Sequence, residues 1–102
     1  VVAFCRFGPS KESDVPPLTF EIFALNVEPS RWRSGVGRFL TERVLLEARS
    51  QGFETCTLWT LTDNARARRF YEAIGFGLDG ATRTEAASSN HPLHEVRYRQ
   101  FL

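Results

Sequence analysis

Residues Val27 to Arg38, with the sequence VEPSRWRSGVGR, form the stretch on which the interpretation of this chain depends. An apolar run that begins at Leu18 precedes it, and an amphipathic run that ends near Ser50 follows it. This order predicts a turn between a strand and a helix. Glycines at Gly35 and Gly37 would let an anionic ligand approach the backbone N–H groups at the helix start, where the helix dipole is positive. A phosphate-bearing cofactor is therefore the first hypothesis.

The composition is that of a folded globular protein. The chain has 102 residues, of which 42% are hydrophobic and 25% are charged, and a formal net charge of +1. We expect a single domain spanning residues 1–102. The near-neutral charge gives no general case for binding nucleic acid or an anionic membrane. No apolar run approaches the roughly 18 residues that a membrane span needs, and no leader is apparent, so we expect a cytoplasmic protein.

The cysteines and histidines do not have the spacing of metal ligands. Cys5 and Cys56 are far apart in the sequence, and two reduced core thiols are preferred to a disulfide. His91 and His94 have no cysteine or acidic companions at ligand spacing and are expected in a polar loop. No metal site is therefore expected.

Two strands are predicted before the opening stretch. The first is Val1 to Phe7, stopped by Gly8-Pro9, and a polar loop at residues 10–17 separates it from the run Leu18 to Val27. Both faces of that run are largely apolar, which predicts a central strand. Glu21 lies inside it, on the face of Phe23 and Leu25 if the pleat is regular, and a buried carboxylate needs an explanation.

Helical and strand patterns alternate after the opening stretch. A first helix should run from Gly35 to near Gly52 with one apolar stripe, and a second, short helix should end before Gly75 with another. The first stripe comprises Val36, Leu40, Val44 and Ala48, and the second comprises Ala67, Phe70, Tyr71 and Ile74. Residues 54–61 between the helices read as a strand. After the second helix, Gly75 to Leu78 should begin another strand or turn, followed by a polar loop from Asp79 to Pro92 and a final strand, Leu93 to Leu102, nearer a sheet edge. The fold class is α/β (α+β), with a mixed, largely antiparallel sheet and helices packed on it.

Several motifs occur in a specific order along the chain. A long strand ends in Val27-x-Pro29, the helix starts with Gly35-x-Gly37, the strand ETCTLWTL follows, and the last motif is Asn64-Ala65-x-Ala67-x-x-Phe70-Tyr71-x-x-x-Gly75-Phe76. This order resembles the GCN5-related N-acetyltransferase (GNAT) superfamily. The resemblance covers about residues 20–76 together with a terminal strand. It implies the GNAT acyl-CoA N-acyltransferase fold without its usual N-terminal strand and helices, so that the chain represents the C-terminal two-thirds of the fold.

The resemblance implies an enzyme that moves an acetyl group from acetyl-CoA directly to a primary amine. The family binds the CoA pyrophosphate on backbone amides of the loop and helix start, here Arg33, Ser34, Gly35, Val36, Gly37 and Arg38. The pantetheine arm would follow the long strand at Leu25 and Val27 and contact Asn64. Tyr71 would be the general acid that protonates the departing CoA thiolate. Trp32 departs from the pattern, because the family usually has Gln or Arg three residues ahead of the first glycine.

The chemistry also requires a base. An alkyl ammonium has a pKa near ~10.4, and only its neutral form attacks the thioester. Glu21 is the candidate, since it stands fourteen residues before Gly35, as does the catalytic glutamate in the histone-acetylating branch of the superfamily. Its apolar neighbours would raise its pKa towards a useful range.

Simpler structural interpretations remain open for each of these residues. Periodicity alone makes Tyr71 a core aromatic, Asn64 an N-cap, and Glu21 a structural carboxylate at a strand bulge or strand end. Arg66, Arg68 and Arg69 are expected on a solvated helix face, with a contact to the CoA 3′-phosphate as the alternative. For the whole protein, the alternative is a catalytically silent CoA-binding or dimerisation module. The acceptor is a small-molecule or peptide amine that the sequence does not identify, and homodimerisation is possible.

Overall fold

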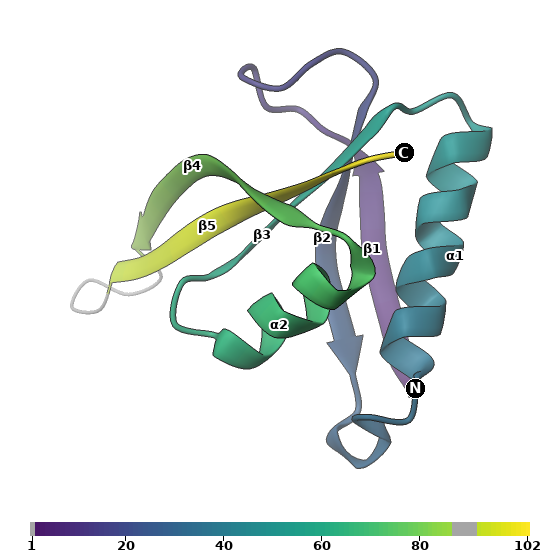
Figure 1. Cartoon of the computed structure of the whole chain (residues 1–102). Coiled ribbons are helices and arrows are strands. Elements are labelled where there is room, and N and C mark those ends of the chain that lie inside the picture. Colours follow the sequence, from purple (N-terminus) through teal and green to yellow (C-terminus); the bar gives the residue numbers. More distant parts are fainter. Residues whose placement is uncertain (1, 87–91) are drawn as a thin grey trace. The chain divides into compact units, whose positions relative to one another are not determined.

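The computed structural model describes residues 2–86 and 92–102 and has an α/β architecture (Figure 1). Its elements in chain order are β1 (Ala3–Pro9), β2 (Thr19–Val27), the 3-10 turn η1 (Pro29–Arg31), α1 (Val36–Ser50), β3 (Thr55–Leu61), α2 (Ala65–Ile74), β4 (Gly77–Ala86) and β5 (Pro92–Phe101). The five strands form one sheet in the order β1-β2-β3-β5-β4, and β1/β2 and β4/β5 are antiparallel pairs. The predicted fold class is therefore confirmed.

The described chain divides into two compact units. The first runs up to Thr57 and includes Phe101 and Leu102, and the second is Leu58–Gln100. The first unit contains the β1/β2 hairpin, helix α1, which packs against both strands, and the beginning of β3. The second contains the rest of β3, helix α2 and the β4/β5 hairpin.

Strand β2 is buried along its first half only. Residues 19–22 are buried, whereas Phe23 is 41% exposed, so the prediction of two buried faces is correct only near the start of the strand. The pairing with β1 shifts by one residue between Arg6 and Phe7. A one-residue shift exchanges the faces on which side chains point. The regular pleat that would place Glu21 on the same face as Leu25 is therefore interrupted.

Helix α1 buries a stripe that differs from the predicted one. Its buried residues are Gly37, Thr41, Val44 and Ala48, whereas Val36 and Leu40 are only half-buried. Thr41 can be fully buried because its hydroxyl donates to the Gly37 carbonyl at 2.8 Å. The helix ends as predicted, because Gly52 has φ +93° and the Phe53 N–H bonds to the Ala48 carbonyl at 3.1 Å.

Strands β4 and β5 of the second unit differ from two predictions. The segment predicted as a polar loop from Asp79 begins with the strand β4, which pairs with β5 as far as Ala86, while residues 87–91 lie outside the described chain. The final strand lies between β3 and β4, so the edge position belongs to β4 instead. The strand or turn expected from Gly75 to Leu78 does contain the start of β4 at Gly77, and polar residues, which are normal on an edge strand, explain why the part from Asp79 on was mistaken for a loop.

Charged residues of β5 fit an interior position because they have partners within the unit. Arg97 is 5% exposed and pairs with Asp79 of β4 at 2.6 Å between Nε and Oδ2. Glu95 accepts from Nε of Arg83 at 2.8 Å. These ion pairs link β5 to β4 and explain why charge in the sequence did not indicate an edge.

Both cysteines of the chain are free thiols, as predicted. Cys5 on β1 is half-buried and Cys56 on β3 is buried. Burial raises the pKa of the Cys5 thiol, and burial, with smaller contributions from Cys5 and Glu21, raises that of Cys56 to about 12. The two thiols therefore stay protonated and act as small apolar groups at neutral pH.

Candidate functional site

The turn between β2 and α1 has a backbone shape suited to an anion. Arg33 and Gly35 have left-handed φ values of +64° and +89°, and Gly35 is the N-cap of α1. A left-handed residue followed by a right-handed helical one points successive N–H groups into a shared concavity. A Cβ added to Gly35 would meet no atom within 4 Å. The glycine is therefore required by the backbone conformation and not by lack of space.

The charges around this turn also favour an anion. The first turn of α1 carries no acidic residue, and no side chain caps it. The N–H groups at a helix start have no partner within the helix, so they are available to a ligand. Arg31, Arg33 and Arg38 are all exposed there, and Arg38 lies 3.5 Å from Glu42 one turn further along the helix.

The end of β2 is engaged by the unusual tryptophan of the turn. Nε1 of Trp32 donates to the Val27 carbonyl at 2.9 Å, and the side chain is 49% exposed. Val27 and Leu25 are the two strand positions predicted to offer backbone groups to a ligand. Trp32 therefore bonds to the carbonyl of one of these two predicted positions. Sequence reasoning noted Trp32 as a departure but did not predict this hydrogen bond.

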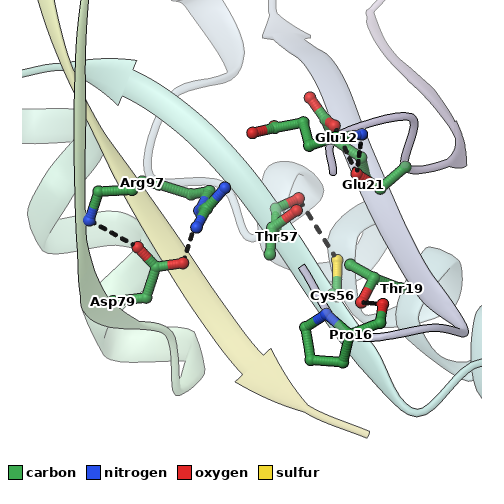
Figure 2. A network of polar contacts seen from close by, with 10 residues as sticks. Glu12, Pro16, Thr19, Glu21, Cys56, Thr57, Asp79 and Arg97 are labelled. Atoms are coloured by element: carbon green, nitrogen blue, oxygen red, sulfur yellow. Dashed lines mark hydrogen bonds and ion pairs between the residues drawn. The ribbon is translucent and has the colours of Figure 1, made fainter. Parts of the chain in front are cut away.

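Glu21 is a buried carboxylate near the start of β2. It is 8% exposed, and its Oε1 accepts a hydrogen bond from the Ser10 hydroxyl at 3.3 Å. The Ser10 Oγ accepts in turn from the Glu12 N–H at 3.3 Å. Figure 2 shows Glu12 beside Glu21. Cys56 of β3 is close enough for the Glu21 charge to contribute to the raised pKa of its thiol. A buried carboxylate with a hydroxyl donor has the chemistry of a proton acceptor.

The remaining predicted site residues lie on α2. The Asn64 side chain accepts from the Ala67 N–H at 3.0 Å, so Asn64 is an N-cap, and Gly75 ends the helix with φ +110°. Tyr71 is half-buried, and its ring centroid lies 5.9 Å from that of Phe76 and 6.5 Å from that of Tyr98. The structure thus places Tyr71 in an aromatic cluster, in agreement with its helical periodicity.

One arginine of the cluster on α2 is not on a solvated face. Arg68 is half-buried, and its guanidinium donates to the Tyr98 hydroxyl and to the Thr62 carbonyl, each at 3.0 Å. Arg66 and Arg69 are exposed. His94, predicted in a loop, is on β5, where its Nδ1 lies 3.2 Å from the Thr84 hydroxyl, and His91 lies outside the described residues.

The predicted residues are divided between the two units. Glu21, the strand positions at 25 and 27, and the turn at 33–38 belong to the first unit, whereas Asn64 and Tyr71 belong to the second. Within residues 2–86 and 92–102 no group of three His, Cys, Asp or Glu side chains could hold a metal ion. In the same ranges, no helix has the length and apolar character to cross a membrane.

Comparison with known proteins identifies the family. Residues 1–76 match the model of the acetyltransferase (GNAT) family. The chain belongs to the GNAT family. The matched residues contain β1 to α2, and so include the turn before α1, Glu21 and Tyr71.

The chain is similar over different lengths to individual acetyltransferases. A mycothiol acetyltransferase from Beutenbergia cavernae is 43% identical over 58 residues, which are 57% of this chain and 20% of that protein. A Mycobacterium tuberculosis protein named as a probable N-acetyltransferase is 32% identical over 98% of this chain and 54% of its own length. A Bacillus subtilis acetyltransferase solved in complex with CoA has a TM-score of 0.79 at 18% identity, covering 100% of this chain and 70% of that one. The matched part of this chain thus spans about a fifth of the length of the B. cavernae protein and about half of the length of the M. tuberculosis protein.

Proposed function

We propose that this GNAT protein is an acetyl-CoA-dependent N-acetyltransferase that moves an acetyl group directly to a primary amine. Membership of the family is the observation that carries the proposal. The left-handed turn at Gly35, the uncapped start of α1 and the exposed arginines around it support a CoA pyrophosphate at residues 33–38.

The spacing along β2 supports an extended ligand between the turn and the base. Glu21 and Val27 are six positions apart along the strand, which is about 20 Å at ~3.3 Å per residue. A pyrophosphate held at the turn is therefore remote from Glu21, and a pantetheine arm lying along the strand would bridge much of that length. In this proposal the backbone groups of Leu25 and Val27 hold the arm, and Asn64 contacts it in addition to capping α2.

The proposed chemistry assigns one proton transfer to each of two side chains. Glu21 takes a proton from the ammonium of the acceptor, and the neutral amine then attacks the thioester carbonyl. The C–S bond breaks as the amide C–N bond forms, and Tyr71 gives its phenolic proton to the departing thiolate. The proton that the nitrogen loses on becoming an amide returns to the Tyr71 phenolate and restores the phenol. The buried carboxylate and its Ser10 donor support the first role. The half-buried position of Tyr71 supports the second.

Steady-state kinetics on two glutamate variants test the assignment of the base. Glu21→Gln should lower kcat by roughly 10²-fold or more, because a positioned base contributes ~10²- to 10⁴-fold, and should leave the Kd for acetyl-CoA nearly unchanged. Glu28→Gln, which changes an exposed carboxylate at the end of the same strand, is the matched control and should retain full turnover. Unaltered turnover of Glu21→Gln across the pH range would remove Glu21 from the mechanism.

The same assays separate the enzyme from the alternative of a silent CoA-binding or dimerisation module. Thiol release from acetyl-CoA is measured with a panel of small-molecule and peptide amines, alongside the affinity for CoA measured by calorimetry. Amine-dependent release supports the enzyme. Tight CoA binding without release for any amine supports the silent module.

A further inference from the structure

A fully buried tyrosine of β5 joins two residues of α2 in the second unit. Tyr98 is 0% exposed, and its hydroxyl donates to Oε2 of Glu72 at 2.6 Å. The same oxygen accepts from Nε of Arg68 at 3.0 Å. The hydroxyl is therefore used both as a donor and as an acceptor, each time with a charged partner, and such hydrogen bonds are stronger than neutral ones.

The two partners bracket the residue proposed as the general acid. Arg68 and Glu72 are four positions apart and so lie one helical turn from each other, and Tyr71 lies between them in the sequence. Arg68 is itself fixed by a second bond, from Nη1 to the Thr62 carbonyl at 3.0 Å. The turn of α2 that carries Tyr71 is thus tied to β5 and to the segment that precedes the helix.

Helix α2 depends on such ties for its position. It has ten residues, and none of them is buried. Helices of this length are marginal by themselves, and most of their stability comes from tertiary contacts. Gln100, two residues after Tyr98 and so on the same face of β5, adds a bond from its Nε2 to the Ile74 carbonyl at 3.3 Å. One face of β5 therefore holds α2 at two successive points.

The ring of Tyr98 also contributes to the surroundings of Tyr71. The two ring centroids are 6.5 Å apart, within the range of aromatic contacts. The Phe76 ring makes a T-shaped contact with the Tyr71 ring, with 5.9 Å between the two centroids. Burial and the Glu72 hydrogen bond raise the pKa of Tyr98, although Arg68 opposes the shift, so the hydroxyl keeps its proton at neutral pH.

We propose that Tyr98 is a positioning residue for Tyr71, acting through its hydrogen bonds to Arg68 and Glu72 and through ring contact. The inference rests on the proposed function, since it gives Tyr71 the role of general acid. Tyr98 does not touch the reacting atoms in this scheme. It sets where the turn of α2 carrying the phenol lies, and a displacement of about 1 Å at a catalytic group can lower a rate by roughly 10²-fold.

A double-mutant cycle with Tyr71→Phe and Tyr98→Phe tests the proposal. Tyr71→Phe should lower kcat by about 10²-fold, and Tyr98→Phe by about 10-fold, with the KM for acetyl-CoA within about twofold of the wild type in both. If Tyr98 acts through Tyr71, the double variant should have the kcat of Tyr71→Phe within about twofold. Independent, multiplying losses would overturn the proposal, because they would show that Tyr98 acts elsewhere.

Variants of Glu72 and Asp79 separate positioning from general destabilisation. Glu72→Gln keeps a weaker, neutral acceptor for the Tyr98 hydroxyl and should lower kcat less than Glu72→Ala, which should show the loss of Tyr98→Phe. Asp79→Asn disrupts the ion pair with Arg97 and should lower Tm more than Tyr98→Phe does while keeping full kcat below its Tm. Equal loss of kcat in Asp79→Asn, or in Glu72→Gln and Glu72→Ala alike, would overturn the proposal.

The kinetics of Tyr71→Phe and Tyr98→Phe separate the general-acid role of Tyr71 from the positioning role of Tyr98. Normal turnover of Tyr71→Phe would remove the general acid from the proposed function, and the positioning role with it. A slow Tyr71→Phe together with a Tyr98→Phe that turns over like the wild type would overturn the positioning role alone.

Discussion

The ion pair between Asp79 and Arg97 offers a quantitative test of how the second unit is held together. The two side chains are only 3% and 6% exposed, and they meet at 2.6 Å between Oδ2 and Nε. Figure 2 shows Asp79 and Arg97 pointing toward each other. The other carboxylate oxygen accepts from the Ala81 N–H at 2.9 Å, and the Arg97 guanidinium lies 5.4 Å from the centre of the Trp59 ring. Replacing Asp79 by Asn keeps the shape and removes the charge.

The expected cost follows from burial. Removing one partner of a buried ion pair costs about 3–5 kcal/mol, because the other charge stays desolvated without its counter-ion. An asparagine oxygen can still accept from the Ala81 N–H, and Trp59 still attracts the cation, so we expect the lower end, about 3 kcal/mol. For a chain of this size each kcal/mol shifts Tm by roughly 4–8 °C, which gives a fall of roughly 12–24 °C.

Thermal and urea unfolding followed by tryptophan fluorescence and circular dichroism measure this cost. The matched variant is Asp79→Leu combined with Arg97→Met, which removes both charges together. Because an apolar pair can replace a buried ion pair at little cost, the double variant should be more stable than Asp79→Asn. The reasoning is refuted if Asp79→Asn unfolds within about 1 kcal/mol of the wild type, or if the double variant is the less stable of the two.

Three further predictions concern single residues. Burial raises the pKa of the Cys56 thiol from 9.0 to about 12. The protonated thiol therefore stabilises the fold fully below pH 9, and this stabilisation is lost as pH rises towards 12. From pH 8 to pH 10 the free energy of unfolding, measured by urea titration, should fall by about 1.4 kcal/mol more in the wild type than in Cys56→Ala, and equal falls would contradict this. Gly75→Ala should lower the free energy of unfolding by about 1–2 kcal/mol, because φ is +110° and the new Cβ would lie 2.7 Å from Nε2 of Gln100. Gly77→Ala is the control in thermal unfolding and should be nearly neutral, because its Cβ would meet no atom within 4 Å. Trp32→Phe removes the indole N–H from the Val27 carbonyl and should tighten acetyl-CoA binding about 2- to 10-fold in calorimetry if the pantetheine arm needs that acceptor; unchanged or weaker binding would exclude such competition.

Local patterns predicted the parts of the fold in which sequence and environment agree. The glycines at 35, 52 and 75 have left-handed φ values at helix ends, where turn chemistry favours glycine. The period of α2 and the strand character of residues 55–61 were likewise correct. In these segments propensity, pattern and capping all favour the same structure.

Failures came where tertiary partners decide the outcome. Thr41 is a core residue because a hydroxyl can bond back to the Gly37 carbonyl, which a count of apolar residues does not register. The part of β4 from Asp79 on was missed because an edge strand carries polar residues. β5 was placed at the edge because the partner of Arg97 is 18 residues away in sequence. The bulge beside Phe23 depends on the register of two strands, which a single strand does not reveal.

The candidate site was predictable to a similar extent. Sequence motifs indicated Glu21, the turn at 33–38 and Tyr71, and the structure adds what surrounds them. Sequence spacing could not reveal three contacts: the bond of Ser10 to Glu21, the bond of Trp32 to Val27, and the bonds of Tyr98 to α2. Each joins groups that are brought together only by folding. Their roles in a reaction remain predictions.

Transfer of labelled acetyl groups from acetyl-CoA is the measurement that tests the central claim most directly. The protein is incubated with acetyl-CoA labelled in the acetyl group and a panel of primary amines, and the products are analysed by mass spectrometry. The account predicts labelled amide and one free CoA thiol for each amide formed, with both slowed together in Glu21→Gln and in Tyr71→Phe. The absence of labelled amide for every amine tested, with no binding of CoA by calorimetry, would contradict it.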